Sequence, residues 1–463
     1  MAIEYCEVFP IVLLLCIFFN VEAQQATFDI TKYGAKTGGD STKAVTDAWK
    51  AACTSTTGSK VVIPKGTFPV KNLKLEGPCK AAIGIQLQGT LQAPGDVSQQ
   101  SKKDPWIAIQ YVEDFTLDGG GTFDGNGQNT WSQKQAKKLE FSQPTNLGLN
   151  FLTNAVIQDI TSLNSKMFHI NVLGCKGITL QRIKTTAPDE SPNTDGIHVG
   201  RSNGVKILDC TLETGDDCIS LGDGSQQVIV NGAKCGPGHG ISIGSLGLYD
   251  NEQPVKGVFV KSSTLTGTMN GVRIKTWQNS PVGEASDIHF EDIKMSNVGN
   301  PIIIDQEYCP QKNCKSSSTP SKVKISNVGF KGITGTSSTQ EVVKLVCSKS
   351  YPCTGVEIGD INLSYNGGAA TSVCTNVQPK LSGNQVPSVC TGSSSSGSGN
   401  NKSSGSSNSG NNKSGGSNNS GNNKSGGNNN SGNNKSNSAS SKASASSKAS
   451  ASSKASASSK ASG

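Results

Sequence analysis

Short runs of β-branched and other apolar residues recur along most of this chain, and this repetition restricts the fold more than any other feature. The runs begin at Phe115, Ala155, Gly177, Gly204, Gln227, Gly257, Asp287 and Lys322. From Gly177 onward most intervals are about 23 to 34 residues, with turns rich in Gly, Asn and Asp between the runs. Such a period is typical of a solenoid whose coils each contain several short strands. The sequence therefore predicts an all-β parallel solenoid, because the main alternative, an antiparallel sandwich, predicts no constant period.

One segment has a helical pattern instead. Residues 41–53, STKAVTDAWKAAC, place apolar side chains at Ala44, Val45, Ala48 and Ala52, which lie on one face of a helix. A solenoid has an open end with unpaired strand edges, and natural solenoids cover that end. We expect this short helix to cap the N-terminal end of the stack.

The N-terminal residues 1–23 predict a secretory signal peptide. Residues 11–19, IVLLLCIFF, are too few to span a bilayer as a helix, and Val21 to Ala23 have the small-residue pattern of a cleavage site. The segment before them departs from the usual signal, because it contains Glu4 and Glu7 and no Lys or Arg. A membrane anchor or a buried strand is the alternative. With cleavage near Ala23, the protein is expected to be exported and to have no membrane contact.

The C-terminal residues 391–463 contain Ser, Asn, Gly, Lys and Ala, and no aromatic or acidic residue. Such a segment cannot bury a core, so we predict a disordered tail after a folded domain of residues 24–390. The eight lysines of the tail account for the formal net charge of +8, which leaves the preceding residues balanced. This balance argues against a nucleic-acid partner. The tail is either a tether to an anionic polymer or a solvated spacer.

Seven Asn-x-Ser patterns are candidate glycosylation sites in an exported protein. Only Asn362 lies in the folded part, and the tail contains the others: Asn401, Asn412, Asn418, Asn423, Asn429 and Asn434.

Twelve of the fourteen cysteines lie between residues 24 and 390, and an exported chain is expected to pair them. Sequence separation favours five pairs: Cys53 with Cys79, Cys218 with Cys235, Cys309 with Cys314, Cys347 with Cys353, and Cys374 with Cys390. Separation alone does not fix connectivity. Cys175 and Cys210 fit a further pair or buried free thiols equally well. Zinc binding is less favoured, because no pair of C-x-x-C knuckles occurs.

Three aspartates and one histidine are separated by intervals of about one coil length. Asp195 lies 21 residues before Asp216, and His239 lies 22 residues after Asp217. In a parallel solenoid, residues one coil apart stack at the strand spacing of about 4.8 Å. These four residues are therefore expected on one face, and Arg273 and Lys275, two positions apart, are expected to share the face of a later coil.

Stacked carboxylates repel each other, so at least one should have a raised pKa and hold a proton. Glycoside hydrolysis needs one protonated and one ionised carboxyl group, and nearby cations suit an acidic sugar. Two simpler interpretations remain for the Asp216–Asp217 pair. It could be a solvated turn flanked by glycines, or it could bind calcium. In a regular strand the two side chains would point to opposite faces, so we expect a bend or bulge after Gly215.

Five segments resemble the signatures of a known family. NTDGIHV, GDDCISLG, GPGHGISIGSLG and RIKTW, followed by DQEYC at residues 305–309, are similar in type and order to those of the polygalacturonases, the family 28 glycoside hydrolases. The resemblance covers about residues 27–390 and is greatest to the plant pollen-type exopolygalacturonases. It implies a single-stranded right-handed parallel β-helix that hydrolyses α-1,4 bonds of polygalacturonate with inversion and without metal or cofactor.

The resemblance also implies roles for eight residues. Asp216 corresponds to the general acid, Asp195 and Asp217 to the carboxylates that hold and activate water, and His239 to the histidine that maintains the protonation of the acid. Arg273, Lys275, Tyr308 and Asn193 correspond to substrate-binding residues.

A monomeric enzyme secreted to the cell wall and acting on pectin is expected. Exo-action rests on overall resemblance, and three alternatives remain: an endo-acting enzyme, a pectate lyase, which would use calcium and a base, and a non-catalytic pectin-binding wall protein.

Overall fold

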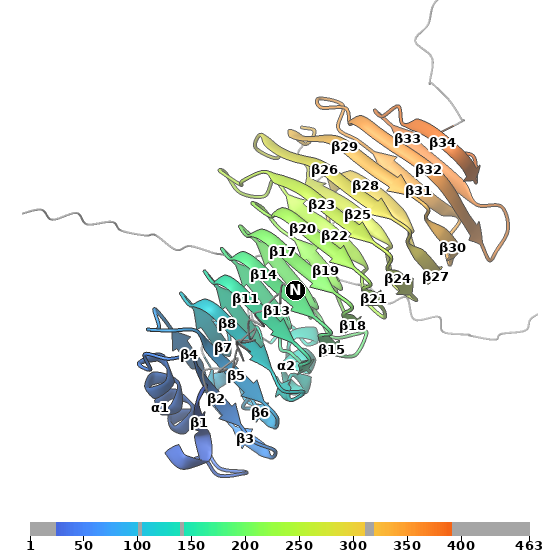
Figure 1. Ribbon diagram of the computed structural model, residues 1–463. Coiled ribbons are helices and arrows are strands. Elements are labelled where there is room, and N and C mark those ends of the chain that lie inside the picture. Colours follow the sequence, from blue (N-terminus) through green and yellow to red (C-terminus); the bar gives the residue numbers. More distant parts are fainter. Residues whose placement is uncertain (1–24, 101–103, 139–142, 311–318, 391–463) are drawn as a thin grey trace, which may run out of the picture. The chain divides into compact units, whose positions relative to one another are not determined.

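The computed structural model describes residues 25–100, 104–138, 143–310 and 319–390 (Figure 1). The predicted signal peptide, the predicted tail with its six sequons, and Cys314 lie outside the described residues.

The chain winds through three series of parallel strands, which Figure 1 shows stacked one coil after another. The first series comprises β1 (Ala26–Asp29), β2 (Ser59–Ile63), β5 (Ile83–Leu87), β8 (Glu113–Asp118), β11 (Thr153–Gln158), β14 (Lys176–Gln181), β17 (Asn203–Leu208), β20 (Gln226–Asn231), β23 (Val255–Lys261), β26 (Gly283–Glu291), β29 (Val323–Lys331), β32 (Thr354–Tyr365) and β34 (Lys380–Val386). The second comprises β3 (Thr67–Pro69), β6 (Thr90–Gln92), β9 (Thr122–Asp124), β12 (Thr161–Leu163), β15 (Lys184–Thr186), β18 (Thr211–Glu213), β21 (Lys234–Cys235), β24 (Thr264–Thr266), β27 (Lys294–Val298) and β30 (Thr334–Ser337), which pairs with the end of β32.

The third series forms a separate 11-stranded sheet in the described part of the chain. It comprises β4 (Leu73–Glu76), β7 (Ile107–Gln110), β10 (Leu147–Asn150), β13 (Ile170–Leu173), β16 (Ile197–Gly200), β19 (Ile219–Leu221), β22 (Ile241–Leu246), β25 (Val272–Trp277), β28 (Ile302–Tyr308), β31 (Glu341–Val346) and β33 (Thr371–Thr375). The predicted right-handed parallel β-helix is thereby confirmed.

The eight apolar runs that predicted the solenoid all fall in the first series, on β8, β11, β14, β17, β20, β23, β26 and β29. Within each strand the side chains alternate. Val205 and Ile207 of β17 are buried, whereas Lys206 between them is exposed. The next coil repeats the pattern in register, because Val205 pairs with Val228 and Ile207 with Val230. Inward residues of successive coils thus stack into one continuous core.

The predicted N-terminal cap is confirmed as α1 (Thr42–Cys53). Ala44, Val45, Ala48 and Ala52 are buried, and Trp49 lies edge-on to Phe115 at 6.2 Å between ring centroids. A short 3-10 helix, η1 (Ile30–Tyr33), packs beside α1, and a second, η2 (Val97–Gln99), follows β6.

A second α-helix, α2 (Gln128–Gln135), was not expected. Its sequence is mostly polar, and only Thr130 and Trp131 are buried, so it lacks the apolar stripe that reveals a helix. It lies between β9 and β10, on the path from the second series of strands to the third.

Four of the five predicted disulfides are confirmed: Cys53–Cys79, Cys218–Cys235, Cys347–Cys353 and Cys374–Cys390. Cys309 is disulfide-bonded, and its predicted partner Cys314 lies outside the described residues. Cys175 and Cys210 are buried free thiols, which decides between the two possibilities left by the sequence.

Of the helices in the described ranges, none combines the length and the apolar character needed to cross a bilayer. Asn362 is exposed on β32, as a glycosylation acceptor would have to be.

Candidate active site

The predicted site residues gather on the outer face of the 11-stranded sheet, over five adjacent strands from β16 to β28. The acidic residues and His239 lie just before the first three of these strands. Ile197 of β16 pairs with Ile219 of β19, which pairs with Ile241 of β22. Two residues before these positions lie Asp195, Asp217 and His239, and the same register stacks them. The 22-residue offset therefore aligns Asp195 with Asp217, and not with Asp216 as the spacing suggested. Asp216 lies beside this row.

Asp216 and Asp217 lie in a bend that precedes β19. Of the two expected possibilities, a bend or a bulge, the structure has the bend, and it comes before the strand begins. Gly215 permits this path. A Cβ atom at Gly215 would lie 2.2 Å from the carbonyl oxygen of Ser191, so no other residue fits there. The main-chain oxygen of Asp216 accepts a hydrogen bond from the main-chain nitrogen of His239, at 2.7 Å.

Asp217 is almost completely buried and is held by three donors. Its Oδ1 accepts from Ser242 Oγ and from Arg273 Nη2, both at 2.8 Å, and its Oδ2 accepts from Lys275 Nζ at 2.9 Å. The side chains of Arg273 and Lys275 are only 13% and 9% exposed. In this structure the two predicted substrate-binding cations therefore form ion pairs with a carboxylate of the protein, which the sequence did not indicate.

Asp216 has different partners on its two oxygens. Oδ1 lies 2.9 Å from His239 Nδ1 and also accepts from the main-chain nitrogen of Asp217, at 2.8 Å. Oδ2 accepts from Asn193 Nδ2 at 3.2 Å. Burial favours the neutral form of Asp216, but the hydrogen bond and charge of His239, with the charge of Lys275, outweigh it and hold the pKa of Asp216 below its ordinary range.

Pairing with Asp216 also shifts the pKa of His239. Burial opposes the charged imidazole, but the hydrogen bond and the charge of Asp216 outweigh burial and raise the pKa of His239 above its ordinary value. The two shifts agree in describing an ionic pair, an imidazolium beside a carboxylate.

Asp195 is buried, and its Oδ2 accepts from Ser220 Oγ at 2.7 Å. Burial, followed by the negative charges of Asp216 and Asp217, raises the pKa of Asp195 well above its ordinary value. Of the residues expected to include a carboxyl group with a raised pKa, Asp195 has the raised value, whereas the pKa of the predicted general acid, Asp216, is lowered.

Tyr308 lies at the end of β28, on the side of the site toward the later coils. Lys275 Nζ lies 5.3 Å from the centroid of its ring, and Trp277 lies edge-on to it at 5.2 Å between centroids. Burial raises the pKa of Tyr308. The structure thus brings together all eight predicted residues, from Asn193 to Tyr308.

Four further residues support the site and were missed by sequence reasoning. His198, Ser220 and Ser242 occupy one row on the sheet, in register with Arg273. Ser220 Oγ links Asp195 to His198 Nδ1, which lies at 2.8 Å. Strand alternation around the isoleucines of β16, β19 and β22 could have identified this row, because each row residue follows an inward isoleucine. The fourth, Lys134 of α2, carried no signal in the sequence.

Asp216, Asp217 and His239 each offer one ligand atom within 4.8 Å of the others, so this group could also hold a metal ion. The ion pairs of Asp217 with Arg273 and Lys275 act against a divalent cation there, because they place positive charge on both Asp217 oxygens.

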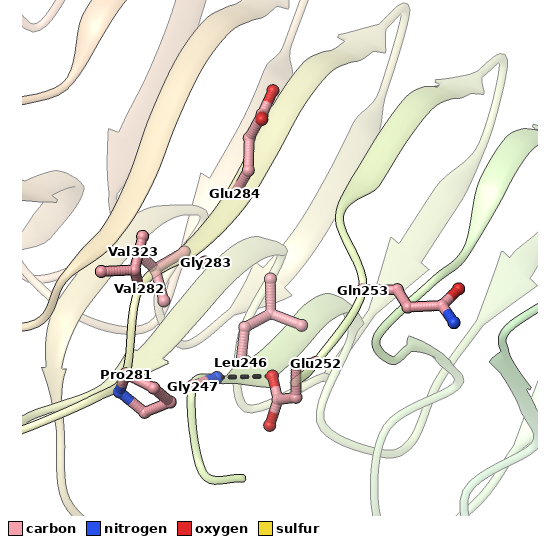
Figure 2. A pocket seen from close by; sticks show the side chains of 9 residues that line it. All are labelled: Leu246, Gly247, Glu252, Gln253, Pro281, Val282, Gly283, Glu284 and Val323. Carbon is pink, nitrogen blue, oxygen red and sulfur yellow. Dashed lines mark hydrogen bonds between the residues drawn. The ribbon is translucent and has the colours of Figure 1, made fainter. Parts of the chain in front are cut away.

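A separate small, open hollow lies between the end of β22 and the start of β26. Figure 2 shows Glu252 at this hollow, where its Oε2 accepts from the main-chain nitrogen of Gly247 at 2.6 Å. Its Oε1 accepts from the main-chain nitrogens of Leu248 and Tyr249. Glu252 therefore closes a turn, and none of the predicted site residues lines the hollow.

Fold and site together define a class: a parallel β-helix with the paired acid groups that glycoside cleavage uses. Within that class, residues 53–388 match the glycosyl hydrolases family 28, and the chain belongs to that family.

Relatives agree with this membership, and a solved structure shares the fold. An exopolygalacturonase of Oenothera organensis is 53% identical over 359 residues, which cover 76% of this chain and 99% of that protein. A polygalacturonase of Gossypium hirsutum is 52% identical over 388 residues, 82% of this chain and 95% of that protein. Among solved structures, an endo-xylogalacturonan hydrolase of Aspergillus tubingensis has a similar fold, with a TM-score of 0.66 and 24% identity over 77% of this chain and 100% of that one.

Proposed function

We propose that this protein hydrolyses α-1,4 bonds between galacturonate residues of polygalacturonate. The observation that carries the proposal is the assembly of three carboxyl groups, His239 and two cations on one sheet face of a family 28 chain. The names of the relatives support the substrate, since they are polygalacturonases and exopolygalacturonases. The direct experiment is release of reducing ends from polygalacturonate by the purified full chain, with no release expected from a neutral glucan.

Asp216 is the proposed general acid, working together with His239. The leaving oxygen needs a proton as the bond from the anomeric carbon breaks. The Asp216–His239 pair holds one proton at acidic pH, as an imidazolium and a carboxylate. The negative charge that develops on the leaving oxygen draws this proton from His239 through Asp216 to that oxygen.

Asp217 and Asp195 are the proposed pair that handles water. As water attacks the anomeric carbon, Asp217 takes the proton that the water loses, and Asp195 orients the water. Three donors already occupy the oxygens of Asp217, which makes it a weak nucleophile and favours direct attack by water over a covalent intermediate. This supports inversion. One oxygen of Asp216 and one of Asp217 lie within 4.8 Å of each other. Inverting enzymes usually separate their two carboxyl groups by about 6.5–9.5 Å, so this distance by itself would favour retention of the anomeric configuration.

Arg273 and Lys275 are proposed to serve two purposes. They balance the charge of Asp217, and their exposed fractions offer positive charge to a substrate carboxylate, next to Tyr308. A methyl ester lacks that charge and should be cleaved poorly.

Exo-action, secretion to the cell wall and a monomeric state complete the proposal. Exo-action is supported by the names of two relatives at 53% and 50% identity, and export by the disulfides. The proposed organisation is a signal of residues 1–23, a catalytic domain of residues 24–390 and a tail of residues 391–463. Early products decide the mode, since an exo-enzyme releases small products of one size and an endo-enzyme releases mixed oligomers. A lyase would instead give an unsaturated, ultraviolet-absorbing product and lose activity with a chelator.

A further inference from the structure

The second helix, α2, reaches from its own coil toward the catalytic carboxylates. The indole nitrogen of Trp131 donates to the main-chain oxygen of Ser165, at 3.0 Å, on the loop before β13. At the end of α2, Gln135 Nε2 donates to the main-chain oxygen of Glu190 at 3.1 Å, on the loop before β16. The helix is therefore fixed to the loop that carries Asn193.

Lys134 lies between these attachments and begins a chain of hydrogen bonds that ends at Asp216. Its Nζ donates to the side-chain oxygen of Asn193 at 3.3 Å and to the main-chain oxygen of Pro192 at 3.4 Å. The amide nitrogen of Asn193 then donates to Asp216 Oδ2 at 3.2 Å.

The chemistry of the two ends fixes the amide in the middle. An ammonium group can only donate and a carboxylate can only accept, so Asn193 must turn its oxygen to Lys134 and its nitrogen to Asp216. The main chain of Asn193 is left-handed, with φ of 60°, which places the side chain between its two partners. Without Lys134 the amide could rotate and present its oxygen to the carboxylate, a repulsive contact.

We propose that Lys134 is a positioning residue for this reaction, which acts on Asp216 through Asn193. The inference rests on the proposed function, because it assigns Asp216 the role of general acid. Lys134 orients the donor on Asp216 Oδ2, while His239 and the main chain of Asp217 hold Oδ1. The carboxyl group is thus fixed from both sides before substrate binds.

The charge of Lys134 is compatible with this role. Burial lowers the pKa of Lys134 to about 8, although the charges of Asp216 and Asp195 oppose the shift. The ammonium therefore remains the main form at the acidic pH at which the Asp216–His239 pair holds its proton.

The first test compares three single variants in the full chain. Lys134→Gln removes the charge, Lys134→Arg keeps a cationic donor, and Lys138→Gln removes a charge from the exposed residues that follow the same helix. Lys134→Gln should lower kcat about tenfold with KM changed less than about twofold, whereas Lys134→Arg should retain about half of kcat and Lys138→Gln should match the wild type. A rise in KM alone would overturn the proposal and make Lys134 a substrate-binding cation. An unchanged kcat would also overturn it.

A double-mutant cycle tests the route through Asn193. If Lys134 acts through that amide, most of the effect of Lys134→Gln should disappear in an Asn193→Ala background. If the two substitutions instead lower kcat by independent factors that multiply in the double variant, Lys134 does not act through Asn193. Lys134→Met, which keeps the aliphatic part of the side chain, replaces Lys134→Gln if the latter lowers the melting temperature.

A readout that needs no activity separates this inference from the proposed function. His239 is one of four histidines in the chain, so its ring protons can be followed by NMR titration. Lys134→Gln should raise the pKa of His239 further, by about half a unit. A nearby positive charge is lost, and the hydrogen bond from Asn193 to Asp216 Oδ2 weakens, so the carboxylate of Asp216 interacts more strongly with the imidazolium. An unshifted His239 overturns the inference, whereas absence of reducing-end release by the wild type overturns the proposed function alone.

Discussion

His239 Nδ1 and Asp216 Oδ1 lie 2.9 Å apart, on consecutive coils of the solenoid. Each residue accounts for much of the shift in the other: the imidazolium holds the pKa of Asp216 down, and the carboxylate holds the pKa of His239 up. The parallel stacking of coils produces this pair, because it brings together residues that are 23 positions apart in the chain.

The Asp216→Asn variant should lose at least about 99% of the activity on polygalacturonate, because the amide keeps the shape of the side chain but cannot donate an acidic proton. Initial rates of reducing-end release measure this loss, and the melting temperature checks the fold. Asp189→Asn, on an exposed part of the loop before Asn193, is the matched control and should retain full activity. Retention of a tenth of the activity by Asp216→Asn would remove Asp216 from the role of acid.

Activity should be high at acidic pH and should fall as the pH rises. The raised pKa values of His239 and Asp195 mean that both groups are protonated at low pH and lose their protons on the alkaline side. The stability of the fold should also decrease as the pH rises. The ion pair of His239 with Asp216 stabilises the fold fully below pH 6.5, and this contribution is lost as the pH rises through the raised pKa of His239 in the folded state.

A pH–rate profile of kcat/KM checks this expectation, with His239→Gln as the comparison. In that variant the alkaline limb should move or disappear, and the melting temperature should depend less on pH above 6.5. An optimum above neutrality would favour a lyase-type base instead.

Lys275→Gln should affect both kinetic constants. KM for polygalacturonate should rise about tenfold, because positive charge near the substrate carboxylate is lost, and kcat should also fall, because Asp217 Oδ2 loses its ion pair. Lys344→Gln removes the same charge from an exposed position on β31, where Lys344 pairs with Glu341, and should behave as the wild type. If Lys275→Gln changes KM only, the pairing with Asp217 does not contribute to the chemical step.

The first product should be the β-anomer of the released galacturonate residue, the result of one inversion at an α-linkage. Proton NMR of the anomeric signals within the first minutes distinguishes it from the α-anomer. An initial α-product would mean that the short Asp216–Asp217 spacing reports a covalent intermediate.

Replacement of both Cys218 and Cys235 by Ala should destabilise the fold by about 3 kcal/mol, the entropy expected for a cross-link that closes 17 residues. This disulfide joins the residue after Asp217 to β21, so kcat should fall as well. Cys347→Ala with Cys353→Ala, which closes a shorter loop of 6 residues, should cost less stability and leave kcat unchanged. Chemical denaturation of the three forms measures the difference.

The repeat of apolar runs was sufficient to predict the solenoid, because the period-2 alternation and the coil length are both local properties of the chain. The helix at the N-terminus, four disulfides and the grouping of Asp195, Asp216, Asp217 and His239 followed from the same local spacing. Stacked coils convert a sequence interval into a contact, so a solenoid reveals its site in its sequence more readily than a globular fold does.

Other features depend on three-dimensional packing. Three features were not predicted: the ion pairs of Arg273 and Lys275 with Asp217, the raised pKa of Asp195 in place of Asp216, and the hydrogen bond from Lys134 to Asn193. Each is an interaction between side chains whose partner is chosen by burial and orientation, and long cationic side chains can reach several partners at similar sequence distances. The sequence thus determined which groups share one face of the protein. Only the tertiary structure decided which of these groups have shifted pKa values and which of them bind each other. The reason is that desolvation and hydrogen-bond direction depend on the surroundings of each atom.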